Sequence, residues 1–179
     1  MIRVLILLAD GFEEIEAVTL IDVLRRAGVE VIGASLGDTC VRGAHNISLL
    51  ADCRLGDNQS ESFDCVLLPG GMPGSRNLRD DPRVLALLRQ SANEGKYVGA
   101  ICAAPIALEA AGVIKGKRAT SYPGFDLPSA RYCEDRVVVD GKVVTSRGPG
   151  TALEFALEWV KILVGSGEAE QLRQEMVAQ

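Results

Sequence analysis

Short apolar runs bounded by turn residues recur along the chain, and each run is rich in branched aliphatic side chains. Nearly continuous runs of this kind predict strands that are buried on both faces of a parallel sheet. The predicted strands are Arg3–Ala9, Val29–Ala34, Phe63–Leu68 and Tyr97–Ile101. Two hairpins are also predicted, one within Thr39–Leu50 and one in which Arg136–Asp140 and Lys142–Ser146 flank Gly141.

Segments with helical spacing separate these strands. Glu14–Ala27 carries an apolar stripe, and Gly28 follows as a typical stop; the stripe is Ile15, Val18, Ile21 and Leu24. Further helices are predicted over Pro82–Glu94, over Pro105–Ala111, from Pro149 or Gly150 onward, and over Glu168–Val177. The alternation predicts an α/β layered fold with a mostly parallel sheet, and the length predicts one domain over residues 1–179.

Composition and charge exclude several classes of protein. The chain is 47% hydrophobic and 24% charged, which is typical of a globular domain. Its net charge is −5 and its basic residues are scattered, so we expect no direct binding of duplex nucleic acid. The apolar run Val4–Ala9 is too short to span a membrane. The five cysteines match neither a disulfide framework nor a paired-thiol motif, which favours the reducing cytoplasm.

Cys102 stands between a predicted strand and a predicted helix, with small residues at 99, 100, 103 and 104. A nucleophile on such a turn is lifted out of the sheet and meets backbone N–H groups that can hold an oxyanion. The positive end of the following helix is expected to favour the thiolate. The alternative is a buried, unreactive thiol, which is the usual state of a free cysteine and the one we assign to the other four.

Glu13, Glu14 and Glu16 cluster at the start of the first helix, where the helix dipole favours carboxylates. For Glu13 and Glu14, this interaction predicts side chains on a helix face that is exposed to solvent. Glu16 lies at the edge of the apolar stripe and could point along the top of the sheet toward Cys102. A carboxyl held there in apolar surroundings would have a raised pKa and could exchange a proton with the sulfur.

A glycine-rich turn, residues 68–74, follows the Phe63–Leu68 strand, but it matches neither a phosphate-binding loop nor a dinucleotide fingerprint. Gly70 or Gly71 could present a backbone N–H to a bound anion, or the glycines could serve a tight turn alone. The single histidine, His45, falls in the predicted first hairpin. With one histidine and isolated cysteines, we expect no zinc site.

Four segments, residues 9–18, 67–71, 100–105 and 145–151, together resemble the ThiJ/PfpI superfamily. The resemblance is to the branch that contains the Parkinson-disease protein deglycase and its bacterial YajL-like relatives, and it covers essentially the whole chain. It implies a flavodoxin-like sandwich, similar to class I glutamine amidotransferases, with helices on both faces of the sheet. It also implies a homodimer.

The resemblance further implies roles for particular residues. Cys102 would be the nucleophile, Glu16 the protonated carboxyl bonded to its sulfur, and Gly71 and Ala103 the donors of anion-holding backbone N–H groups. Tyr122 occupies a place where many relatives carry a histidine, which disfavours a histidine-assisted hydrolase. His45 stands where close relatives have an arginine that approaches the site across the dimer interface, while Arg26 and Arg147 match family positions.

Two functions remain open at this point. The first is a cofactor-free glyoxalase or deglycase that acts on methylglyoxal-type dicarbonyls or early glycation adducts. The second is a redox-responsive chaperone or oxidative-stress sensor, with client proteins as partners, that is switched by oxidation of Cys102 to a sulfinic acid. Both use the Cys102 thiol, so the sequence does not separate them.

Overall fold

A computed structural model of the chain describes residues 1–57 and 62–178. Its centre is a seven-stranded sheet in the order β10-β11-β7-β6-β1-β2-β5. All neighbouring strands run parallel except the β10–β11 hairpin. The strands are β1 (Arg3–Leu8), β2 (Glu30–Ser35), β5 (Cys53–Arg54), β6 (Cys65–Leu68), β7 (Tyr97–Ile101), β10 (Val137–Asp140) and β11 (Val143–Ser146).

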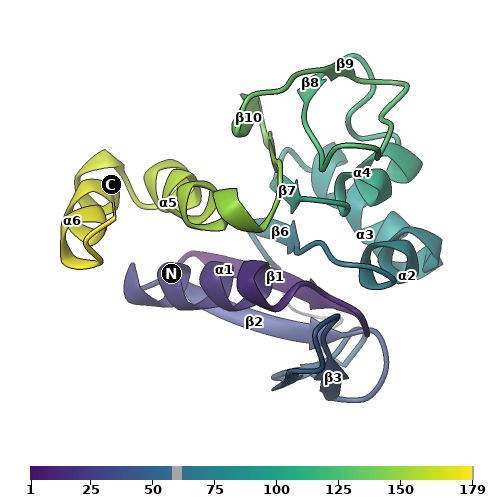
Figure 1. Cartoon of the computed structure of the whole chain (residues 1–179), viewed down its shortest axis with the longest axis horizontal. Helices are drawn as coiled ribbons and strands as arrows, with labels where there is room; N and C mark the ends of the chain where they lie inside the picture. The colour runs from purple at the N-terminus through teal and green to yellow at the C-terminus, as the bar shows by residue number, and fades with distance from the viewer. Residues whose placement is uncertain (58–61, 179) are drawn as a thin grey trace.

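Helices cover both faces of this sheet (Figure 1). One face carries α1 (Glu14–Arg26) and α5 (Ala152–Leu163), and α6 (Ser166–Glu175) packs beside α5. The other face carries α2 (Gly74–Asp80), α3 (Pro82–Asn93) and α4 (Pro105–Ala111). These three layers and the strand order confirm the expected flavodoxin-like α/β fold. Within the described ranges, no helix is long and apolar enough to cross a membrane.

Two small sheets lie outside the central one. The antiparallel pair β3 (Cys40–Arg42) and β4 (Ser48–Leu50) confirms the first predicted hairpin. The parallel pair β8 (Arg118–Ala119) and β9 (Arg131–Tyr132) was not predicted, and neither were β5 and α2. The short strands have two residues each, and α2 buries only one large apolar side chain, so none of them carries an apolar pattern that can be recognised.

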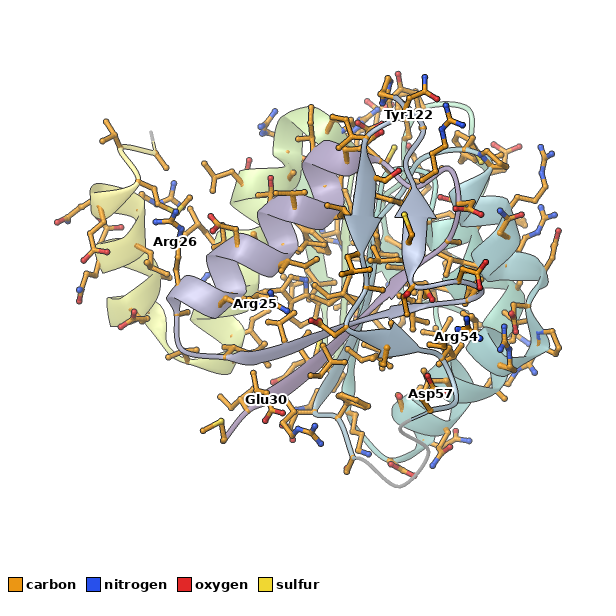
Figure 2. All side chains as sticks on the ribbon, turned by 90° about the horizontal axis from the view of Figure 1, so that it is seen from below. Arg25, Arg26, Glu30, Arg54, Asp57 and Tyr122 are labelled. Atoms are coloured by element: carbon orange, nitrogen blue, oxygen red, sulfur yellow. The ribbon has the colours of Figure 1, made fainter. Side chains whose placement is uncertain are left out.

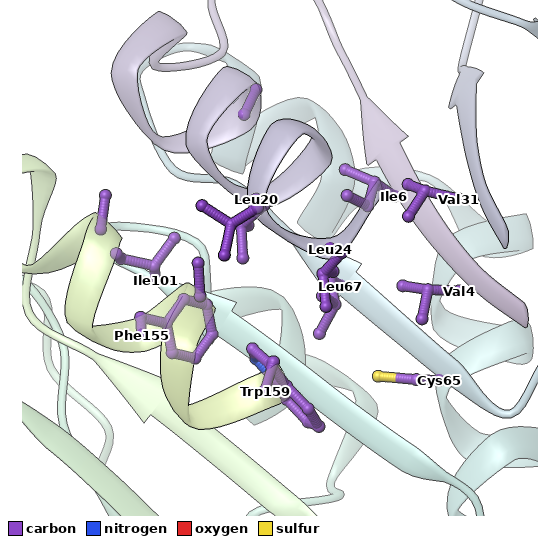
Figure 3. Close-up of a cluster of buried hydrophobic side chains, with 14 of the residues drawn as sticks. Val4, Ile6, Leu20, Leu24, Val31, Cys65, Leu67, Ile101, Phe155 and Trp159 are labelled. Carbon is purple, nitrogen blue, oxygen red and sulfur yellow. The ribbon is translucent and has the colours of Figure 1, made fainter. Parts of the chain in front are cut away.

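The core explains why the central strands are continuously apolar. Alternate residues of β1 enter different clusters: Val4 and Ile6 face α1 and α5, whereas Leu5 and Leu7 face the other helical layer. Figure 3 shows the cluster that contains Val4 and Ile6. In it, the aromatic side chains Phe155 and Trp159 of α5 lie beside α1 and the central strands. Its labelled members are Val4, Ile6, Leu20, Leu24, Val31, Cys65, Leu67, Ile101, Phe155 and Trp159.

The predicted stripe of α1 is wrong at its N-terminal end. Ile15 is 57% exposed and Val18 is 45% exposed. The buried face instead contains Glu16, followed at helical spacing by Leu20 and Leu24. Because Glu16 is polar, the sequence pattern placed it at the edge of the stripe, although it lies on the face that packs inward.

The hairpin at the sheet edge offers a matched test of core packing. Val139 and Val144 are directly paired across β10 and β11, but Val144 is fully buried and Val139 is 41% exposed. We expect Val144→Ala to lower the free energy of unfolding by about 2 kcal/mol, because it removes two buried methyl groups. Val139→Ala should change it by less than about 1 kcal/mol. Urea unfolding followed by Trp159 fluorescence measures both, and equal losses would contradict the assigned core.

Candidate active site

Cys102 occupies a strained turn between β7 and α4. Its φ is 64°, a left-handed conformation that residues with a side chain rarely adopt and that is often found at functional sites. Two backbone hydrogen bonds hold the turn: Cys102 N–H donates to the Ser146 carbonyl at 2.9 Å, and Tyr122 N–H donates to the Cys102 carbonyl at 2.8 Å. The predicted strand–turn–helix placement of this cysteine is confirmed. Its side chain lies at the carboxyl end of the parallel sheet, where α/β proteins bind their ligands.

Glu16 projects from the first turn of α1 toward this cysteine and is fully buried. Its Oε2 accepts a hydrogen bond of 2.6 Å from the Gly70 N–H, and the carboxyl lies within hydrogen-bonding reach of the Cys102 thiol. Among the described residues, the other oxygen, Oε1, has no partner of standard hydrogen-bond geometry. Its hydrogen-bonding capacity is therefore unused within the described part of the chain.

Gly70 is the residue that allows the contact. A Cβ at this position would lie 2.5 Å from the Cys102 Cβ and 2.7 Å from the Glu16 Oε2, which is closer than atoms can approach. Its N–H is used by Glu16, so the expectation that Gly70 presents this group to a bound anion does not hold in this arrangement. Gly70 therefore leaves room for the Glu16 carboxyl and also donates a hydrogen bond to it.

The surroundings shift the pKa of both reactive groups. Burial raises the pKa of Glu16 to about 7, and the charge of Glu13 acts in the same direction. Burial also raises the pKa of Cys102 to about 12, with a further contribution from Glu16. The expected lowering of the thiol pKa is therefore wrong. The largest cause is the loss of hydration on burial, and the helix that follows begins only at Pro105 and has seven residues.

Backbone N–H groups of Gly71 and Ala103 approach the Cys102 sulfur and act against the rise in its pKa. Gly71 has a φ of 88°, and a Cβ there would lie 2.6 Å from the Gly11 carbonyl oxygen. The backbone at this point therefore accepts only glycine. The two N–H groups lie where the negative charge of an oxyanion or a thiolate would develop.

Tyr122 and Arg147 lie near the Cys102 turn along the backbone: the Tyr122 N–H donates to the Cys102 carbonyl, and Arg147 follows Ser146, whose carbonyl accepts the Cys102 N–H. Tyr122 is 45% exposed and lines a hollow together with Arg147 and Gly148. The Arg147 Nη1 donates to the Glu134 carbonyl at 3.0 Å. Arg26 is not part of this group, because it lies at the opposite end of α1 and pairs with Asp22 at 2.7 Å. Figure 2 shows Arg26 well separated from Tyr122.

The structure corrects the environment predicted for Glu13 and Glu14. Both are buried, with exposed fractions of 9% and 5%, rather than on a solvated face. Burial alone would raise the pKa of Glu14, but hydrogen bonds from His45 and Ile47 bring it below its usual value. The same hydrogen bond raises the pKa of His45, and Glu13 adds to that rise. No local sequence pattern predicts this cluster, because the hairpin that carries His45 contacts α1 only in the folded structure.

Together these features define an α/β protein in which a buried carboxyl lies beside a cysteine thiol on a strained turn. Comparison with known proteins gives the family. A model of the DJ-1/PfpI family matches residues 2–162, and the chain belongs to that family.

Several relatives are similar over nearly all of this chain. Protein DJ-1 homolog B of Arabidopsis thaliana is 41% identical over 174 residues, which cover 95% of this chain but 40% of the relative. The chain thus spans less than half the length of this curated relative. The glutathione-independent glyoxalase DJR-1.2 of Caenorhabditis elegans is 36% identical over 163 residues, with 89% and 87% covered. The crystal structure of Drosophila melanogaster DJ-1beta superposes with a TM-score of 0.96 at 39% identity and covers 99% of this chain and 98% of that one.

The raised pKa of Glu16 makes stability depend on pH. The folded chain keeps a proton on Glu16 up to about pH 7, whereas an ordinary glutamate loses it near 4.5. The folded state therefore loses stability as pH rises from 4.5 to about 7. The loss in the free energy of unfolding amounts to roughly 3 kcal/mol. We expect the free energy of unfolding of the wild type to fall with pH relative to that of Glu16→Gln. Urea unfolding at several pH values measures this difference, and parallel curves for the two proteins would contradict it.

Proposed function

We propose that this protein is a cofactor-free glyoxalase, which converts methylglyoxal-type dicarbonyls to hydroxy acids at Cys102. The observation that carries the proposal is the buried Glu16 carboxyl beside the thiol, with a pKa of about 7. Near neutral pH such a group both accepts and donates protons, which is what a general acid–base catalyst requires. The glyoxalase among the relatives supports the same chemistry.

The reaction begins with addition of the thiol to the aldehyde carbon. A C–S bond forms, Glu16 accepts the thiol proton and returns it to the aldehyde oxygen, and the product is a hemithioacetal. A preformed thiolate is not needed, which suits a thiol whose pKa burial raises. The Gly71 and Ala103 N–H groups stabilise the oxygen while its negative charge develops.

Proton transfer between the two carbons completes the conversion. Glu16 removes the proton from the sulfur-bearing carbon and delivers it to the neighbouring carbonyl carbon, so that the first carbon is oxidised and the second is reduced. The result is a thioester of the 2-hydroxy acid. Water hydrolyses the thioester, lactate leaves when methylglyoxal is the substrate, and the Cys102 thiol is regenerated. Early glycation adducts are the second substrate class that we propose. In these aminocarbinols and hemithioacetals the former aldehyde carbon carries an amine or thiol of the glycated molecule, which takes up a proton and leaves as the C–S bond to Cys102 forms.

Lactate formation from methylglyoxal without glutathione tests this function. We expect Cys102→Ser to abolish turnover and Glu16→Gln to lower it about 10²- to 10⁴-fold, because both proton transfers use the carboxyl. Cys133→Ser is the matched control, since this cysteine is partly exposed and should leave the rate unchanged. Unchanged turnover in Cys102→Ser would contradict the proposal.

The alternative function, a sensor that responds to oxidation of Cys102, is less well supported by the same site. Peroxide reacts with the thiolate, and burial with a pKa of about 12 keeps the thiolate population low near neutral pH. We also propose a reducing cytoplasmic setting, because the spacing of the five cysteines matches neither a disulfide framework nor a paired-thiol motif.

A homodimer is part of the proposal. Exposed apolar side chains gather on α1 and on the β3–β4 hairpin: Ile15, Val18, Ile47 and Leu50 are between 45% and 80% exposed. Between these elements runs a groove lined by residues that include Val18, Ile21, Leu49 and Leu50. A second copy of the chain is the partner that we propose for this face, because contiguous exposed apolar surface marks sites of protein association.

Sedimentation velocity at low micromolar concentration tests the dimer. We expect a species of twice the 19.1 kDa chain mass for the wild type and a monomer for Leu50→Glu, since a carboxylate would then be buried at the interface. Val139→Glu, on the distant edge strand β10, should remain dimeric. A wild type that sediments at 19.1 kDa would remove this part of the proposal.

A further inference from the structure

Three backbone segments meet at the Cys102 turn. β11 and β7 run parallel and pair Ser146 with Ile101, so Arg147 and Cys102 are the next residues along two neighbouring strands. The Cys102 N–H donates to the Ser146 carbonyl, and the Tyr122 N–H donates to the Cys102 carbonyl. The side chains of Tyr122 and Arg147 therefore start next to the turn that carries the thiol.

The ring of Tyr122 is held on two sides, although the residue is 45% exposed. A Cβ at Gly148 would lie 3.1 Å from the Tyr122 Cδ2, so the absence of a side chain lets the ring pack closely against the backbone. Phe125 contacts the same ring edge-on, with the two centroids 6.4 Å apart. The ring is thus a wall whose position is set before any ligand binds.

Tyr122 borders a hollow whose charged side chains are all basic. This Tyr122 hollow is also lined by Pro123, Arg136, Arg147 and residues 148–151. Among the described residues, two arginines and no acidic side chain line it, in a chain whose net charge is −5. Because charges of one sign in a hollow attract ions of the opposite sign, the Tyr122 hollow favours an anionic group.

The two arginines differ in how much of their charge is free to act on a ligand. Arg136 forms an ion pair with Glu154 at 2.7 Å. Arg147 is half-buried, its Nη1 donates to the Glu134 carbonyl at 3.0 Å, and it forms no ion pair with any described residue. A guanidinium carries five N–H donors, so Arg147 retains donors for a ligand. Its planar fork matches the two oxygens of a carboxylate.

We propose that Arg147 and Tyr122 form a subsite for a carboxylate that the substrate of Cys102 carries at its far end. The proposal rests on the glyoxalase function proposed above and names its substrate class, which is 2-oxoaldehydes with a terminal carboxylate. The Tyr122 hollow lies beside the Cys102 turn and is not lined by Cys102 itself, so the anionic group is separate from the reacting aldehyde carbon. The Tyr122 ring borders the carbon chain, and the Arg147 guanidinium binds the carboxylate.

A simple substrate of this class is 4,5-dioxopentanoate. The Cys102 thiol adds to its aldehyde carbon, and Glu16 transfers the proton of that carbon to the neighbouring carbonyl carbon. Hydrolysis of the resulting thioester consumes one water molecule, releases 2-hydroxyglutarate and regenerates the thiol. The aldehyde carbon is oxidised while its neighbour is reduced, so no external oxidant or reductant takes part. The matched neutral substrate is 2-oxopentanal, which has the same number of carbons and gives 2-hydroxypentanoate.

The ratio of kcat/KM for 4,5-dioxopentanoate to that for 2-oxopentanal tests the subsite. We expect the wild type to favour the anionic substrate and Arg147→Met to lower the ratio at least about tenfold, mainly through KM, because a charged hydrogen bond is lost. Arg147→Lys keeps the positive charge and should retain part of the preference. Arg26→Met is the control, since Arg26 pairs with Asp22 at the opposite end of α1. Circular dichroism verifies that each variant is folded.

Binding of the two products separates this proposal from the glyoxalase function. In amide chemical-shift titrations, we expect 2-hydroxyglutarate to shift the signals of Tyr122 and Gly148 and to bind Arg147→Met at least about tenfold more weakly than the wild type. Such binding in a protein that converts neither 2-oxoaldehyde would contradict the glyoxalase function and support the subsite. Conversion of both substrates with the same ratio in wild type and Arg147→Met, or equal affinity of both proteins for 2-hydroxyglutarate, would overturn the subsite.

Discussion

The contact between the Glu16 carboxyl and the Cys102 thiol governs the architecture of the site. The Glu16 carboxyl is fully buried, and the Gly70 N–H donates a hydrogen bond to it. Such burial is tolerated because the group can take up a proton and become neutral. A pKa of about 7 lets it both accept and donate a proton beside the thiol near neutral pH. The contact also requires a glycine at position 70, since any side chain there would separate the two groups.

The fold supplies the rigid frame for this contact. β7 and β6 are paired neighbours in the sheet, so their carboxyl ends bring Cys102 and Gly70 to the same edge. α1 follows β1 at that edge and turns Glu16 inward, with Leu20 and Leu24 anchoring the same face in the core. The positive φ of Cys102 then lifts the sulfur toward the carboxyl and toward the Gly71 and Ala103 N–H groups. Secondary structure and core packing thereby fix the geometry that the chemistry uses.

The sequence predicted the layers because the strands are continuous apolar runs, and it predicted the elbow because small residues surround Cys102. It did not predict the direction of the Cys102 pKa shift or the burial of Glu13 and Glu14. The thiol pKa depends on how deeply the turn is buried, which no local pattern reports, and burial reversed the direction expected from the helix dipole. Glu13 and Glu14 were assigned to solvent because their cover comes from the distant β3–β4 hairpin. The inward face of α1 was misplaced because it contains a glutamate.

A direct spectroscopic titration of the Glu16 carboxyl would decide whether it holds a proton near neutral pH. Infrared difference spectra of the wild type minus Glu16→Gln isolate the carbonyl stretch of this one protonated carboxylic acid. A band that is present at pH 6 and disappears with a midpoint near pH 7 is the predicted result. A carboxyl already ionised at pH 6 would contradict the raised pKa of Glu16, on which its proposed use as both acid and base near neutral pH depends.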